Sequence, residues 1–202
     1  MIAIIDYGVG NLFSLRSSLT HLGLEAVVTA DAQTIRKADR LILPGVGAFG
    51  DAMDKLSATG LVPVIREQAA QKPLLCICLG MQLLFEKSYE YGEHGGLGFV
   101  KGEVCPLEPD LKDKALKVPQ IGWNALHIVR DDPLFRYIHE GEYVYYVHSY
   151  YGKNCTESTL AVSDYSIPVT GVVRAGRVYG TQFHPEKSGE TGLRILRAFA
   201  EL

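Results

Sequence analysis

Short apolar runs alternate with amphipathic segments along the first half of the chain. Runs of this kind, bounded by turn residues, are typical of strands buried on both faces of a parallel sheet. Leucines repeat every three to four residues at Leu12, Leu15, Leu19 and Leu22, which predicts a helix that ends at Gly23. Strands are predicted at residues 2–6, 25–29, 40–43 and 74–77. Helices are predicted at 11–22, in a short segment capped by Asp31, in a stretch up to Gln71 that breaks near 60–63, and at 79–85.

Between residues 98 and 179 the pattern changes to β-branched and aromatic runs separated by turn residues. Such runs predict mixed or antiparallel strands added to the parallel core. These strands are expected at residues 123–129, 143–147, 160–162, 169–173 and 178–183, followed by a closing helix at 191–200. The chain shows no internal repeat, low-complexity segment or linker, so residues 1–202 are predicted to form one α/β domain. Its central, mostly parallel sheet is expected to be flanked by helices and extended by antiparallel strands.

The composition narrows the class of protein. Of 202 residues, 47% are hydrophobic and the formal net charge is −3, so nucleic acid and anionic membranes are not expected partners. The longest apolar runs have the length of strands, and no basic region precedes the first one, which argues against a membrane span and a signal peptide. The four cysteines do not form the pattern of a disulfide framework, which favours a cytoplasmic location. Only one residue separates Cys76 from Cys78, fewer than in most zinc-ligand pairs, so no metal site is predicted.

The most informative stretch is residues 74–82, where an apolar run ends at Cys78 and a helical segment begins. A cysteine at a sharp turn from strand to helix projects its sulfur out of the backbone near the positive end of the helix, as in a nucleophile elbow. Gly80 allows the helix and the strand to pack closely. Cys76 is interpreted as a small buried hydrophobic residue, which in a regular strand faces the same side as Cys78.

His184 is the best candidate base among the six histidines. It follows the run 178–183 and so stands, like Cys78, at the carboxyl end of a predicted strand, where the active sites of α/β sheets collect. Glu186 projects to the same side of an extended chain and can fix the tautomer of the imidazole. A single cysteine or histidine is more often structural, but the combination favours a Cys–His–Glu triad. The structural interpretation is kept for His21, His94, His127 and His139.

A glycine-rich loop at residues 44–50 follows a predicted parallel strand and lies at the same sheet edge as Cys78. Its glycines allow tight turns, so backbone N–H groups can face a cavity. An oxyanion hole is predicted from the N–H of Leu79 together with that of Val46 or Gly47. The glycines alone favour a simple strand-to-helix turn.

Three motifs together resemble those of class I, triad-type glutamine amidotransferases: Pro44-Gly45-Val46-Gly47, Cys78-Leu79-Gly80-Met81-Gln82 and His184-Pro185-Glu186. Longer segments resemble, within that class, the family of glutaminase subunits of imidazole glycerol phosphate synthase, and they lie at residues 6–11, 119–124, 145–150 and 180–188. The resemblance covers essentially the whole chain. Two positions depart from the family pattern, Cys76 where glycine is frequent and Ile121 where methionine is found.

The resemblance implies a flavodoxin-like fold and a glutaminase reaction that uses neither metal nor cofactor. Cys78 attacks the amide carbon of glutamine, and His184 protonates the departing ammonia and then activates water to hydrolyse the thioester. The ammonia passes to a cyclase partner, a (β/α)8 barrel and the other half of a heterodimer, which forms imidazole glycerol phosphate and AICAR in histidine biosynthesis. The residues expected to bind glutamine are Gln82, His148, Ser149 and Tyr150. The residues expected at the partner interface are Asn11, Trp123, Asn124, Tyr145 and Lys187.

Several alternatives stay open beside this interpretation. The chain could be the glutaminase subunit of another synthase such as pyridoxal phosphate synthase, a noncatalytic domain of the same fold, or a cysteine peptidase or amidase. The segment around Trp123 argues against the subunit of another synthase, and the intact triad argues against a noncatalytic domain. A peptidase or amidase is distinguished by whether ammonia release depends on a cyclase. Trp123 itself is as readily a core residue as an interface residue. Glycines on both sides of Val46 leave its peptide free to rotate, so the isolated subunit is predicted to hold an incomplete oxyanion hole.

Overall fold

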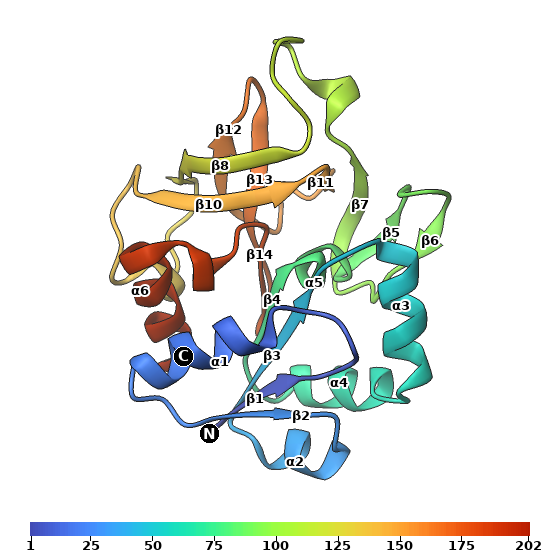
Figure 1. Cartoon of the computed structure of the whole chain (residues 1–202), viewed down its shortest axis with the longest axis vertical. Helices are drawn as coiled ribbons and strands as arrows, with labels where there is room; N and C mark the ends of the chain where they lie inside the picture. Colours follow the sequence, from blue (N-terminus) through green and yellow to red (C-terminus); the bar gives the residue numbers. More distant parts are fainter.

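Eight strands form the central sheet of the computed structural model, which describes residues 1–202 (Figure 1). The first five strands in the sheet run parallel, and the last three continue it in antiparallel pairing. In spatial order the strands are β2 (Ala26–Thr29), β1 (Ile2–Ile5), β3 (Arg40–Gly45), β4 (Leu74–Cys78), β14 (Val178–Thr181), β13 (Pro168–Ala175), β12 (Thr159–Asp164) and β9 (His127–Ile128). The predicted parallel core with antiparallel additions is confirmed.

Helices cover both faces of the parallel half, as Figure 1 shows. In β1, Ile2 and Ile4 belong to the core cluster that includes the helices α1 and α6, whereas Ala3 and Ile5 belong to the cluster under α2, α3 and α4. Because successive residues are buried on opposite faces, each strand is apolar along its whole length. The helices span α1 Leu12–His21, α2 Ala32–Lys37, α3 Phe49–Ala58, α4 Val62–Ala69 and α6 Gly189–Ala200.

Two smaller sheets lie beyond the central sheet. One pairs β10 (Tyr143–His148) with β8 (Gln120–Ala125) in antiparallel fashion, and Figure 1 shows this pair above the parallel strands. The other has the order β11 (Tyr150–Lys153), β7 (Val100–Pro106), β5 (Phe85–Ser88) and β6 (His94–Gly95). Three short 3-10 helices complete the chain: η1 Glu108–Asp110, η2 Pro133–Phe135 and η3 Pro185–Lys187.

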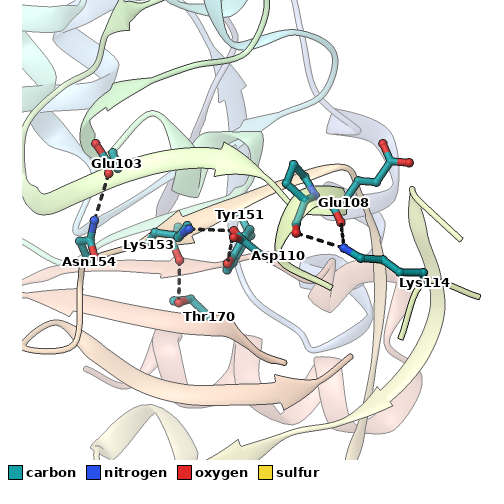
Figure 2. A network of polar contacts seen from close by, with 10 residues as sticks. Glu103, Glu108, Asp110, Lys114, Tyr151, Lys153, Asn154 and Thr170 are labelled. Carbon is teal, nitrogen blue, oxygen red and sulfur yellow. Dashed lines mark hydrogen bonds and ion pairs between the residues drawn. The ribbon is translucent and has the colours of Figure 1, made fainter. Parts of the chain in front are cut away.

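A network of polar contacts joins η1 to β11 (Figure 2). Lys153 Nζ and the Tyr151 hydroxyl donate to the same oxygen, Asp110 Oδ2, at 2.8 and 2.9 Å. The hydrogen bond from Lys153 lowers the pKa of Asp110, which keeps this carboxylate charged at neutral pH. From β13, Thr170 Oγ1 donates to Gly152 O at 2.9 Å, so the smaller sheet is also tied to the central one.

The helix predicted at residues 79–85 is wrong in length. The observed helix α5 spans only Leu79–Gln82, and β5 begins at Phe85. The carbonyl oxygens of Leu83 and Leu84 accept hydrogen bonds from N–H groups of residues 97–100, so they are not available to a further helical turn. Leu83 and Leu84 form the turn between α5 and β5, and their apolar character reflects burial in the core.

The single strand predicted at residues 123–129 is also wrong. It is divided between β8 and β9, which belong to different sheets. The division falls at Leu126, whose N–H donates to Glu142 O at 2.8 Å. The predicted helix break near residues 60–63 is confirmed by the separation of α3 from α4.

Two global features bear on the class of protein. None of the helices combines the length and the apolar character that crossing a membrane requires. All four cysteines are free thiols.

Candidate active site

Cys78 ends β4 in a backbone conformation that residues with a Cβ atom rarely adopt. Its φ of 55° and ψ of −111° turn the chain directly from β4 into α5, which confirms the sharp turn predicted from the sequence. The turn places Cys78 in the same core cluster as Ile77, whereas Cys76 is fully buried in the cluster on the opposite face. Cys78 lines a cavity of about 380 Å³ and Cys76 does not, so the two thiols do not face the same side.

Gly80 allows α5 to contact β3. A Cβ atom at this position would collide with the carbonyl oxygen of Leu43 and would lie 3.3 Å from the carbonyl carbon of Pro44. Because both neighbours are backbone atoms, no side-chain movement would relieve the collision. The close packing expected of Gly80 is confirmed.

His184 and Glu186 lie just beyond β14. His184 Nδ1 is 2.9 Å from Glu186 Oε1, and the two side chains are 4% and 3% exposed. The sequence predicted that an extended chain would bring His184 and Glu186 to the same side, but the two residues meet through the turn of η3. The backbone N–H of His184 donates to the carbonyl oxygen of Tyr145 at 3.0 Å, which fixes this turn against β10. With its Nδ1 directed at the carboxylate, the ring presents its Nε2 to Cys78.

Burial and hydrogen bonding act in opposite directions on the pKa of His184. Burial by itself lowers the pKa of His184, but hydrogen bonds with Cys78 and Glu186 outweigh burial and raise that pKa above its ordinary value. The imidazole therefore readily takes up a proton, as a general base must before it passes the proton to a leaving group. Glu186 Oε2 is buried without a hydrogen-bond partner, so the carboxylate is held through Oε1.

Backbone segments from two elements line the cavity beside Cys78. Gly45 of β3 pairs with Cys78 in the sheet, and the residues that follow them, Val46 and Gly47 after β3 and Leu79 after β4, all line the cavity. Gly47 has a φ of 97°, which glycine adopts at little cost. Backbone N–H groups from two neighbouring segments of one cavity are what an oxyanion hole requires.

The connection from β10 to β11 also lines the cavity. His148, Ser149 and Tyr150 all line the cavity, together with Gln82 from α5. The Gln82 side chain is largely engaged by the protein, because Nε2 donates to Tyr150 O at 2.9 Å and to Gln182 Oε1 at 3.1 Å. The four residues predicted to bind glutamine therefore meet at one cavity, where Gln82 supports the wall.

Two residues of the site escaped the sequence analysis. Glu90, in the loop after β5, is the one carboxylate that lines the cavity, and its Oε2 accepts from the Phe49 N–H at 2.6 Å. Burial raises the pKa of Glu90. Gln182 is fully buried, and its Nε2 lies 3.8 Å from Cys78 Sγ. Gln182 could have been predicted, because it lies two residues before His184 in a predicted strand and so projects to the same side. Nothing in the local sequence around Glu90 indicates a role in the site.

Two of the five residues predicted at a partner interface lie at or next to the same cavity. Lys187 lines it, and Asn11 lines a small adjoining pocket with Glu186. Trp123 is 51% exposed and packs edge to face on Tyr145 with ring centroids 5.8 Å apart, so the alternative of a core tryptophan is wrong. Asn124 is half-buried beside it. No group of three or more His, Cys, Asp or Glu side chains is arranged to hold a metal ion.

Comparisons with known proteins agree with this geometry. The sequence description of class I glutamine amidotransferases matches residues 3–201. The chain is 50% identical to the imidazole glycerol phosphate synthase subunit HisH of Bacillus cereus over 98% of its length and 93% of the relative's. It is 45% identical to the HisH subunit of Wolinella succinogenes over the full length of both chains.

Solved structures share the fold at lower identity. A crystal structure of a glutamine amidotransferase superposes with a TM-score of 0.76 at 19% identity, covering 100% of this chain and 98% of that one. A chain of PurLQS from Thermotoga maritima superposes with a TM-score of 0.75 at 18% identity, covering 99% and 97%. The chain therefore belongs to the class I glutamine amidotransferase family, among the relatives named as HisH subunits of imidazole glycerol phosphate synthase.

Proposed function

We propose that this protein hydrolyses glutamine to glutamate and ammonia through a thioester on Cys78. The observation that carries the proposal is the meeting of a cysteine at a strained turn with a buried His184–Glu186 pair in one cavity. A strained backbone at a cysteine lowers stability, so its presence beside an imidazole that is paired with a carboxylate favours a catalytic site over a noncatalytic domain.

The contacts support a definite order of steps. His184 removes the proton from the Cys78 thiol, and the sulfur attacks the side-chain amide carbon of glutamine. The N–H groups of Leu79 and of Val46 or Gly47 stabilise the oxyanion. Protonated His184, held by Glu186, gives its proton to the departing ammonia, and water activated by the same imidazole then hydrolyses the thioester.

The lining of the cavity also suggests how glutamine is held. Glu90 is the acidic residue that can pair with the α-ammonium group, and Lys187 can pair with the α-carboxylate. His148, Ser149 and Tyr150 supply the wall along the substrate chain. A volume of about 380 Å³ suits a small amino acid better than a peptide, which argues against the peptidase alternative.

The relatives named as synthase subunits support a protein partner. We infer a heterodimer in which ammonia passes directly to a cyclase that forms imidazole glycerol phosphate and AICAR in the cytoplasm, during histidine biosynthesis. The partner face is assigned to Asn11, Trp123, Asn124, Tyr145 and Lys187. Exposed apolar side chains beside these residues, Ile121 and Tyr143 at 62% and 60% exposure, are of the kind that interfaces bury.

Replacing Cys78 by alanine tests the nucleophile. The Cys78→Ala variant is expected to lose glutamine hydrolysis while the assembled synthase still uses free ammonium, because only the glutaminase reaction needs the thiol. Cys105→Ala is the matched control, since this half-buried thiol lies in β7 away from the cavity, and it should keep full activity. Glutamine hydrolysis by Cys78→Ala would contradict the proposal.

The rate of the isolated subunit tests the predicted incomplete oxyanion hole. Loss of one oxyanion donor typically lowers the rate by about a hundredfold or more. Glutamine turnover is therefore expected to rise by about that factor when the loaded cyclase docks. Equal turnover with and without the cyclase would contradict a role for the Val46 peptide.

A further inference from the structure

The ring of His148 makes contacts that the proposed reaction does not explain. His148 is 6% exposed, and both of its ring nitrogens lie beside oxygen atoms. Nδ1 is 2.8 Å from Tyr150 O, and Nε2 is 3.0 Å from Gln120 Oε1. A neutral imidazole carries a single N–H, so it can donate to only one of these two acceptors.

The orientation of Gln120 is set by the protein. Its Nε2 donates to Asn124 Oδ1 at 2.9 Å, and Asn124 Nδ2 donates to Asp164 O at 3.1 Å. A backbone carbonyl only accepts, so Asp164 O fixes the orientation of Asn124, which in turn fixes that of Gln120. Gly122 lies between Gln120 and Asn124 on the same face of β8 and has no side chain to separate their two amides.

His148 is uncharged at neutral pH. Burial lowers the pKa of its imidazole to about 4, and the charge of His184 lowers it as well, although the Tyr150 carbonyl opposes both. One of the two contacts of the ring therefore lacks a hydrogen. Gln120 Oε1 and Tyr150 O can both only accept, but Tyr150 O already accepts from Gln82 Nε2 at 2.9 Å, whereas the His148 ring is the donor that lies beside Gln120 Oε1. The tautomer with its hydrogen on Nε2 is therefore favoured, because it leaves neither acceptor without a hydrogen bond.

We propose that Asn124, Gln120 and His148 form a hydrogen-bond relay through which the partner face sets the tautomer of His148. This inference rests on the proposed function, which places Asn124 at the cyclase interface. When a partner group donates a hydrogen bond to Asn124 Oδ1, the side-chain amides of Asn124 and Gln120 can both rotate so that their oxygen and nitrogen atoms exchange places. Gln120 then donates to His148 Nε2, and the hydrogen of the ring moves to Nδ1.

The two tautomers act differently on the cavity wall. Tyr150 O accepts from Gln82 Nε2 at 2.9 Å in either case. With the hydrogen on Nε2, the lone pair of His148 Nδ1 faces that carbonyl and repels it. With the hydrogen on Nδ1, the carbonyl gains a second donor and the wall is held in place. His148 is thus a positioning residue that makes glutamine binding respond to docking.

Nitrogen-15 NMR of the isolated subunit at pH 7.5, without glutamine or cyclase, tests the relay. The wild-type protein is expected to show His148 neutral with its hydrogen on Nε2. Gln120→Met removes the acceptor and should move the hydrogen to Nδ1. Tyr146→Phe is the matched control, because Tyr146 packs on the His148 ring with centroids 5.5 Å apart but bonds Ser163 outside the relay. This variant should keep the wild-type tautomer.

If Gln120→Met fails to fold because position 120 is buried, Asn124→Leu at the half-buried position 124 provides a second variant. It frees Gln120 to turn and should produce the same change of tautomer. Both variants should lower the glutamine KM of the isolated subunit by roughly two- to tenfold, the worth of one neutral buried hydrogen bond, with little change in kcat.

Three results would overturn the relay: the same tautomer in wild type and both variants, a doubly protonated His148 at pH 7.5, or a change of tautomer in Tyr146→Phe. The NMR measurement needs no turnover, so a failure of the relay is distinguishable from a failure of the glutaminase proposal, which Cys78→Ala tests.

Discussion

The backbone of Cys78 makes an unusual prediction about stability. With φ at 55° and ψ at −111°, a residue with a Cβ atom is strained, whereas glycine is not. Cys78→Gly should therefore be at least as stable as Cys78→Ala. Both variants lack the thiol, so the comparison isolates the backbone from the chemistry. Cys76, two residues earlier in the same strand and fully buried, has no positive φ and serves as the matched control site.

The expected magnitudes follow from three contributions. Glycine in place of alanine loses about 0.8 kcal/mol from burial of the methyl group. It loses a further ~0.4–1 kcal/mol because the unfolded chain is freer. At Cys76 these losses act alone, so the free energy of unfolding should fall by about 1.5 kcal/mol from alanine to glycine. At Cys78 relief of strain adds ~1–3 kcal/mol, and its central value of about 2 kcal/mol exceeds the loss.

Urea denaturation of the four variants, followed by far-ultraviolet circular dichroism, measures the difference. The alanine-to-glycine change at position 78 should be more favourable than the same change at position 76 by about 2 kcal/mol. Equal losses at the two positions would refute the view that the turn at Cys78 stores strain.

Three further predictions concern other parts of the structure. Gly80→Ala should destabilise the protein by ~1–3 kcal/mol in the same urea assay, because its Cβ would collide with the backbone of Leu43. Asp110→Asn should lose ~1–2 kcal/mol of stability at pH 7, through the charged bond with Lys153. The lowered pKa of Asp110 means that this difference is present above the unfolded pKa of about 4 and disappears as the pH falls below it, so an unchanged difference at pH 3 would contradict the assignment. Glu90→Gln should raise the glutamine KM by ~10–100-fold with a smaller effect on kcat, since one charged hydrogen bond to the ammonium is lost, and an unchanged KM would remove Glu90 from the substrate site.

Local patterns sufficed for part of the fold and for the candidate triad. The apolar runs at residues 2–6 and 74–77 predicted their strands, because a strand buried on both faces admits few other residues. Cys78 and His184 were found because each stands directly after such a run. The segment at 79–85 was misassigned because Leu83 and Leu84 are as apolar in this buried turn as they would be in a helix. Only the hydrogen bonds that their carbonyl oxygens accept from residues 97–100 show that the helix ends before them.

The sequence by itself determined the strands and helices of the parallel core, the candidate nucleophile, its candidate base and the family. These depend on motifs and periodicities contained within short segments. The tertiary structure decided which distant groups meet. It brought Glu90 to the cavity, joined Gln120 to His148 across β8 and β10, and left Trp123 exposed. Such contacts depend on the register of strands and the path of loops, which arise from the packing of the whole chain and leave no local mark on the sequence.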